Sequence, residues 1–191
     1  DIEVMDVTEQ LYTNSVIWAL RISDFNENKA GKMSIRAMTN ILKPLYISLD
    51  ELIKKSKGCS KNPSSLTQDI FEAFWKGIEK WEPAMFANAT SHEYGITKSS
   101  QCEVLTGVLN NIVKEFESWK KLGTNIGSLT DPKTYHSLIN DAWNSSNLSD
   151  KDGNGNTVYG SDFWKVGKVG AMGKYTSAAA KRDLRNQLFK L

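Results

Sequence analysis

The chain has 191 residues and a formal net charge of +2 at pH 7, and 40% of its residues are hydrophobic. This composition excludes global disorder, because it supplies enough apolar surface for the core of one domain. The longest apolar runs are too short to span a bilayer, and the amino end does not resemble a signal peptide. Asp1 in place of Met is typical of a processed chain or of a trimmed domain.

Apolar residues recur at helical spacing through the first third of the chain. One stripe predicts a helix over about residues 4–25, although Ser15 fills a gap in it. The members of this stripe are Val4, Val7, Leu11, Trp18, Ile22 and Phe25. A second helix is expected over roughly residues 33–57, and Pro44 inside it should kink it or divide it in two.

The strongest helical pattern is a wide apolar stripe over residues 66–81. Its members are Leu66, Ile70, Phe71, Phe74, Trp75, Ile78 and Trp81. Ser65 and Gln68 have the spacing of a capping box that opens this helix, and Glu82–Pro83 should end it. Because such an apolar stripe is unstable in water, other segments must cover it.

Further helices are expected over residues 105–119, from Thr130 onwards, over 162–175 and over 177–191. Thr130 is the expected cap of its helix, with Pro132 at an early helical position. Convincing alternating strands are absent from the sequence, apart from a short hairpin pattern over residues 153–159. The sequence therefore predicts an all-α, up-and-down bundle of five to seven helices.

We expect three regions along the chain. Residues 1–145 form the bundle, 146–162 a polar, glycine-rich loop, and 163–191 a basic helical segment that packs on the bundle or extends from it. The last segment contains seven basic residues and one acidic residue, so its net charge is +6 and that of residues 1–162 is −4. Such a tail suits docking on the acidic body, or binding to an anionic partner such as a membrane surface.

Two cysteines, Cys59 and Cys102, are compatible with one disulfide, which would stabilise the fold by about 4 kcal/mol in the chain-entropy model. The alternative is a pair of free thiols in a reducing compartment. Asn88, Asn144 and Asn147 lie in Asn-x-Ser/Thr sequons. Together these features favour a secreted or extracellular setting.

Residues 150–155 resemble the opening of an EF-hand calcium loop, with oxygen-bearing side chains at positions one, three and five and glycine at position six. The resemblance then fails, because Thr157 replaces an aliphatic residue and Ser161 replaces the bidentate glutamate. The alternative interpretation is a surface turn. The ligands of a Ca²⁺ ion would be Asp150, Asp152, Asn154, the carbonyl of Asn156 and, later in the loop, Asp162.

No catalytic motif stands out in this sequence. The two histidines, His92 and His136, lack zinc-ligand spacing, and the sequence contains no phosphate-binding glycine loop. The six tryptophans fall mostly on the apolar stripes, where core packing is the default role. Bulky rings also leave cavities between helices, and Trp75, Trp81 and Trp119 are the candidate ligand-binding residues.

These observations favour a non-enzymatic, secreted helical protein that binds an apolar small molecule or a partner macromolecule. Two alternatives stay open: a membrane-active or toxin-like module that uses residues 163–191, and a calcium-stabilised interaction module. We expect no nucleic-acid partner and no cofactor other than Ca²⁺.

Overall fold

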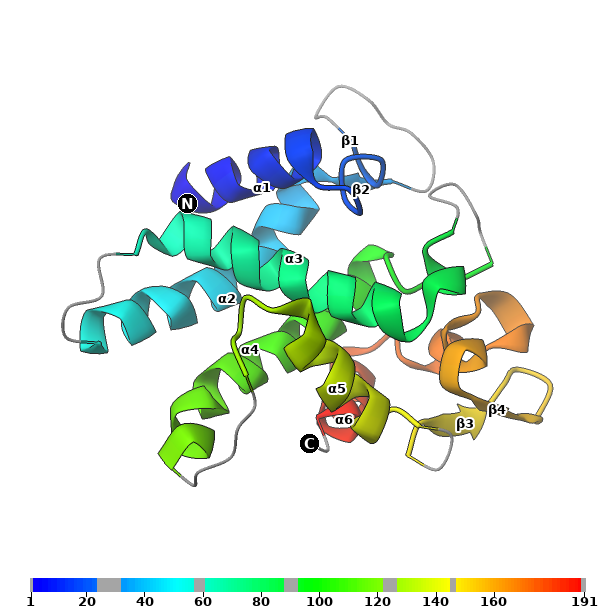
Figure 1. Cartoon of the computed structure of the whole chain (residues 1–191). Helices are drawn as coiled ribbons and strands as arrows, with labels where there is room; N and C mark the ends of the chain where they lie inside the picture. The colour runs from blue at the N-terminus through cyan, green and yellow to red at the C-terminus, as the bar shows by residue number, and fades with distance from the viewer. Residues whose placement is uncertain are drawn as a thin grey trace.

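The computed structural model of the chain describes residues 2–23, 32–56, 61–87, 93–121, 127–144 and 147–189, except for the side chains of residues 120 and 121. Six α-helices occur in these ranges and form an all-α bundle (Figure 1), as the apolar periodicity predicts. They are α1 (Ile2–Asn14), α2 (Ile35–Lys55), α3 (Pro63–Trp81), α4 (Ser99–Lys121), α5 (Pro132–Ala142) and α6 (Ala178–Leu188).

Helix α3 lies at the centre of the bundle and packs against α1, α2, α4 and α5 (Figure 1). The middle of its apolar stripe is buried, and Phe71, Phe74 and Trp75 are each 0% exposed. Leu66 and Trp81, at the two ends of the stripe, are half-buried. The prediction that other segments cover this helix is therefore confirmed.

The first helix is shorter than its apolar pattern predicts, because α1 ends at Asn14. In the turn that follows, the hydroxyl of Ser15 accepts a hydrogen bond from the backbone N–H of Trp18 at 3.2 Å. Trp18 reaches the core and meets the Trp75 ring at a centroid distance of 4.8 Å. Phe25, which the sequence placed on the same helix, lies outside the described residues.

Two helices begin at different capping residues from those expected. Asn62, and not Ser65, caps α3 by accepting a hydrogen bond from the N–H of Ser64 at 2.8 Å. Asp131, and not Thr130, caps α5 through the N–H of Lys133 at 2.9 Å. In both helices a proline follows the cap directly, where its fixed φ angle and missing N–H suit the first helical position.

Helix α2 begins at the cap Ser34, whose hydroxyl accepts a hydrogen bond from the N–H of Ala37 at 3.2 Å. It continues through Pro44 as one helix to Lys55, so this proline does not divide it in two.

Four short strands occur in the described residues as two pairs. β1 (Ile22–Ser23) and β2 (Met33–Ser34) are parallel, whereas β3 (Ser149–Lys151) and β4 (Thr157–Tyr159) form an antiparallel hairpin. The hairpin confirms the turn expected near residues 150–160. Helix α3 ends at Trp81, directly before Glu82–Pro83, as predicted, and a short 3₁₀ helix, η1 (Pro83–Met85), follows.

The predicted helix over residues 162–175 is wrong. This stretch contains three short 3₁₀ helices, η2 (Gly160–Trp164), η3 (Gly167–Val169) and η4 (Met172–Lys174). Gly167 has a φ angle of +71°, which breaks any regular helix, and a Cβ at Gly170 would clash with the carbonyl oxygen of Lys165. The spaced glycines therefore allow tight turns, not a helix with a strip of small residues.

The predicted disulfide is also wrong, because Cys102 is a free thiol. Cys102 is 0% exposed inside α4, and its Sγ atom lies 3.9 Å from Oγ1 of Thr106. Burial raises the pKa of this thiol well above its usual range. A thiol enclosed in this way serves as a small apolar core residue. Cys59 lies outside the described residues.

Candidate functional site

The first candidate ligand-binding residue, Trp75, is enclosed by other rings. Its neighbours include Trp18 at 4.8 Å and Phe74 at 6.0 Å between ring centroids. Its indole Nε1 is buried and has no hydrogen-bond partner. Trp75 is thus a packed core residue in this structure, and a ligand would have to displace its neighbours to reach it.

The other two candidate tryptophans belong to separate aromatic groups. Trp81 is half-buried and meets Trp143 edge to face at 5.6 Å, whereas Trp119 stacks on Phe189 at 6.4 Å. The structure therefore does not gather Trp75, Trp81 and Trp119 around one cavity. Their role in ligand binding stays a prediction.

Asp152 organises the turn of the β3–β4 hairpin. Its Oδ1 atom accepts hydrogen bonds from the backbone N–H groups of Asn154 and Asn156, each at 2.8 Å. The carbonyl of Asn156 accepts a hydrogen bond from the N–H of Asp152, also at 2.8 Å. Burial opposes ionisation of Asp152, but these backbone hydrogen bonds outweigh it and lower the pKa. The Asp152 carboxylate and the Asn156 carbonyl, which the sequence analysis assigned to a calcium ion, therefore form the hydrogen bonds that stabilise this turn.

Asp150 ties the hairpin to the C-terminal segment. Its carboxylate accepts hydrogen bonds from Nζ of Lys174 at 2.7 Å and from the hydroxyl of Tyr175 at 2.6 Å. Burial opposes ionisation of Asp150, but these two hydrogen bonds outweigh it and hold the pKa below its usual value. Burial, together with the hydrogen bond to Asp150, raises the pKa of Tyr175.

The remaining candidate calcium ligands also have protein partners. Asp162 forms an ion pair with Lys165 at 2.8 Å, and Nδ2 of Asn154 donates to the carbonyl of Lys168 at 3.4 Å. Within the described ranges, no group of three or more His, Cys, Asp or Glu residues is placed to hold a metal ion. Calcium binding at this hairpin stays a prediction.

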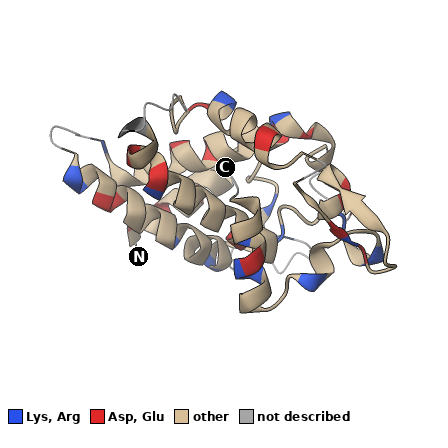
Figure 2. Ribbon diagram, turned by 90° about the horizontal axis from the view of Figure 1, so that it is seen from below, with Lys and Arg blue, Asp and Glu red and all other residues tan. Residues whose placement is uncertain are grey.

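The basic C-terminal segment docks on the body of the protein. Lys165 pairs with Glu93 at 3.5 Å, and Lys181 pairs with Glu103 at 2.6 Å. Trp164 is 0% exposed in the core. Basic and acidic positions are interspersed over the elements seen in Figure 2. Among the described residues, no helix is long and apolar enough to cross a bilayer.

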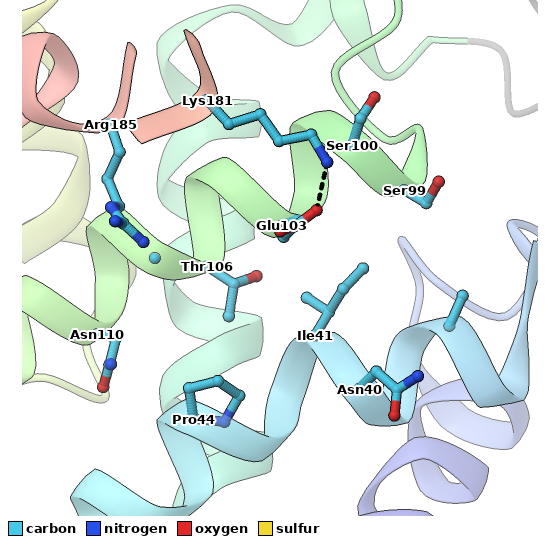
Figure 3. A pocket seen from close by; sticks show the side chains of 12 residues that line it. Asn40, Ile41, Pro44, Ser99, Ser100, Glu103, Thr106, Asn110, Lys181 and Arg185 are labelled. Atoms are coloured by element: carbon cyan, nitrogen blue, oxygen red, sulfur yellow. Dashed lines mark hydrogen bonds and ion pairs between the residues drawn. The ribbon is translucent and has the colours of Figure 1, made fainter. Parts of the chain in front are cut away.

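A cleft of about 500 Å³ lies between α2, α4 and α6, and we call it the α6 cleft (Figure 3). Its size falls within the usual range of small-molecule pockets. Its walls mix apolar groups with polar and charged side chains. The lining residues are Ala37, Asn40, Ile41, Pro44, Ser99, Ser100, Glu103, Thr106, Gly107, Asn110, Lys181 and Arg185.

Two charged residues of α6 reach into this cleft (Figure 3). Lys181 is engaged in its ion pair with Glu103. The Arg185 side chain lies directly on the backbone of α4, because a Cβ built on Gly107 would be 2.6 Å from Cδ of Arg185. Nearby, Oδ1 of Asn110 is buried and has no hydrogen-bond partner.

The α6 cleft continues along α2 and α4 through two further hollows of about 410 and 130 Å³. Adjacent hollows share lining residues, and we call the three hollows together the α2–α4 groove. Beyond the α6 cleft, its lining residues are Asn40, Lys43, Pro44, Ile47, Ser48, Glu51, Leu52, Lys55, Asn110, Val113 and Lys114. Ile47 is 47% exposed in this groove.

Sequence reasoning did not find this site. It placed Lys181 and Arg185 in the basic segment, but the position of this segment against α4 depends on tertiary packing. Two signals were present: the spacing of four residues, which puts both cations on one face of a helix, and Gly107 in the middle of a strong helical pattern.

Comparison with known proteins gives no indication of function. The chain matches no family model, and no curated protein or solved structure is significantly similar to it. Function must therefore be argued from the geometry of the site.

Proposed function

We propose that this protein is a non-enzymatic binding protein that holds an acidic, amphipathic helix of a partner macromolecule in the α2–α4 groove. The observation that carries this proposal is the composition of the groove, in which an apolar floor is flanked by cations. Ile41, Pro44 and Ile47 supply the apolar floor, and Lys43 and Lys114 stand among the residues that line it. This pattern complements a helix with one apolar face and one acidic face.

The shape of the groove supports a helical occupant. It follows α2 from Ala37 to Lys55, a length of about 27 Å at the rise of 1.5 Å per residue. About five helical turns of a partner match this length. A helix laid in such a groove inserts apolar side chains at intervals of three and four residues.

The charge of the groove supports an acidic occupant. Five basic residues and two acidic residues line it, which leaves a net charge of +3. The basic residues are Lys43, Lys55, Lys114, Lys181 and Arg185, and the acidic residues are Glu51 and Glu103. Charge complementarity of this kind speeds association and selects partners more than it adds affinity.

The other interpretations draw less support from the geometry. An apolar ligand held by Trp75 has to enter a core in which Trp18 and Phe74 already fill the space around the ring. Insertion of residues 163–191 into a membrane requires the exposure of Phe163 and Trp164, which are each 0% exposed. The groove needs no such rearrangement.

A synthetic peptide tests the proposal on the full chain. The probe is a helix of about five turns with leucine at positions i, i+3, i+4 and i+7 and glutamate on the opposite face. We expect saturable binding by calorimetry that weakens as salt is raised. The double variant Lys43→Glu, Lys114→Glu should bind about tenfold or more weakly.

The matched control is the double variant Lys80→Glu, Lys133→Glu, which changes the net charge equally on α3 and α5, away from the groove. It should bind the peptide as the unaltered protein does, apart from the small effect of overall charge. Equal loss of affinity in both double variants, or no binding by the unaltered protein, would refute groove docking.

A further inference from the structure

We infer that the α6 cleft contains an oxyanion-binding subsite built around Arg185, which takes a carboxylate or a phosphate group of the ligand. The inference deepens the proposed function and depends on it for the identity of the molecule that carries the anion. The subsite itself rests on two separate observations: the position of Arg185 against α4, and its lack of an ion-pair partner among the described residues.

The first observation is that Arg185 occupies the space that a side chain at residue 107 would need. A Cβ at residue 107 would lie 2.6 Å from Cδ and 3.1 Å from Nη1 of Arg185. Real contacts of this kind are about 3.5–4.0 Å. Gly107 therefore lets the arginine lie flat across the α4 backbone, so that its guanidinium is held at the wall of the cleft (Figure 3).

The second observation is the charge balance inside the cleft. Lys181 and Glu103 neutralise each other at 2.6 Å. Within the described part of the chain, no ion pair or side-chain hydrogen bond ends on the guanidinium of Arg185. A half-buried guanidinium has five N–H donors in a planar fork, and that fork matches the two oxygens of a carboxylate or a phosphate. The cleft thus presents one uncompensated positive charge.

Two variants test the role of Arg185 in different ways. Arg185→Gln removes the positive charge. Gly107→Ala retains this charge but displaces the Arg185 side chain from its position against α4. The matched control is Arg36→Gln, which removes one exposed charge near the start of α2, outside the groove. All three are compared with the unaltered protein for binding of the acidic peptide and, by NMR of the Arg185 side chain, of acetate and inorganic phosphate.

We expect Arg185→Gln and Gly107→Ala to weaken peptide binding about tenfold each, and Arg36→Gln to leave it unchanged. A shift of the Arg185 resonances with phosphate but not acetate assigns a phosphate group, and the reverse assigns a carboxylate. Peptide binding that is equal in all variants overturns the subsite and leaves groove docking intact. Anion shifts at Arg185 without peptide binding support the subsite and refute groove docking. If the peptide does not bind and the Arg185 resonances do not shift with either anion, the subsite and groove docking are both refuted.

Discussion

Gly77 lies where helix α3 packs closely against α5, and its replacement by alanine gives a sharp test of the fold. A Cβ at this position would lie 2.6 Å from Cβ of Tyr135, 3.0 Å from the carbonyl oxygen of Pro132 and 3.1 Å from the backbone nitrogen of His136. Two of these three atoms belong to the backbone of α5. The strain therefore cannot be relieved by rotation of a side chain, and α5 must move by about 1 Å to restore ordinary contact distances.

The expected change in the free energy of unfolding for Gly77→Ala follows from two opposing effects. Overpacking of this kind costs about 1–3 kcal/mol or more, while the higher helix propensity of alanine returns about 1 kcal/mol. Movement of α5 also disturbs Tyr135, which is 0% exposed and donates its hydroxyl to the carbonyl of Leu129 at 2.6 Å. We expect Gly77→Ala to lower the free energy of unfolding by about 2 kcal/mol, and Tm by about 4–8 °C.

Gly107→Ala is the internal control, because its new Cβ meets only the flexible side chain of Arg185. That side chain can swing away, so the helix propensity of alanine should dominate and raise the free energy of unfolding by up to about 1 kcal/mol. Urea denaturation followed by circular dichroism measures both variants. If Gly77→Ala is as stable as the unaltered protein, the close crossing of α3 and α5 is wrong.

Three further predictions concern the hairpin and the buried thiol. Asp150→Asn should reduce the free energy of unfolding by about 1 kcal/mol at pH 7, because it weakens the hydrogen bonds from Lys174 and Tyr175. Since the folded-state pKa of Asp150 is lowered, its contribution is present at neutral pH and is lost as the pH falls below about 4, so the variant and the unaltered protein should converge in acid denaturation. In a Cys59→Ser background, Cys102 should react with a thiol reagent only at the rate of unfolding, and fast labelling of the native protein would contradict its burial. Addition of calcium should raise Tm relative to chelator if the predicted site at Asp150 and Asp152 binds the ion; an unchanged Tm would refute that prediction and leave these carboxylates with their protein partners alone.

The helices that the sequence predicts best are those whose apolar residues form a continuous stripe. The stripes of α3 and α4 lie in the core, because a helix with one wide apolar face has few ways to hide it from water. The stretch around Ser15 shows the limit of this reasoning. Its periodicity continues, yet α1 ends at Asn14, and the residues that follow form a turn from which the Trp18 ring packs against Trp75.

The segment over residues 162–175 shows a second limit. Its spaced glycines are compatible with a helix and with tight turns, and the choice depends on what they approach. The close approach of Gly170 to the Lys165 carbonyl and the burial of Trp164 favour the turns. Tertiary contacts thus outweigh the local pattern here.

The amino-acid sequence by itself determined the class of fold, since apolar periodicity is a local property that each helix carries within its own residues. The site depended on the tertiary structure. The α6 cleft joins Asn40, Gly107 and Arg185, which belong to three helices far apart along the chain. Their meeting is decided by which apolar faces pack together, because no local pattern encodes the distance between two helices.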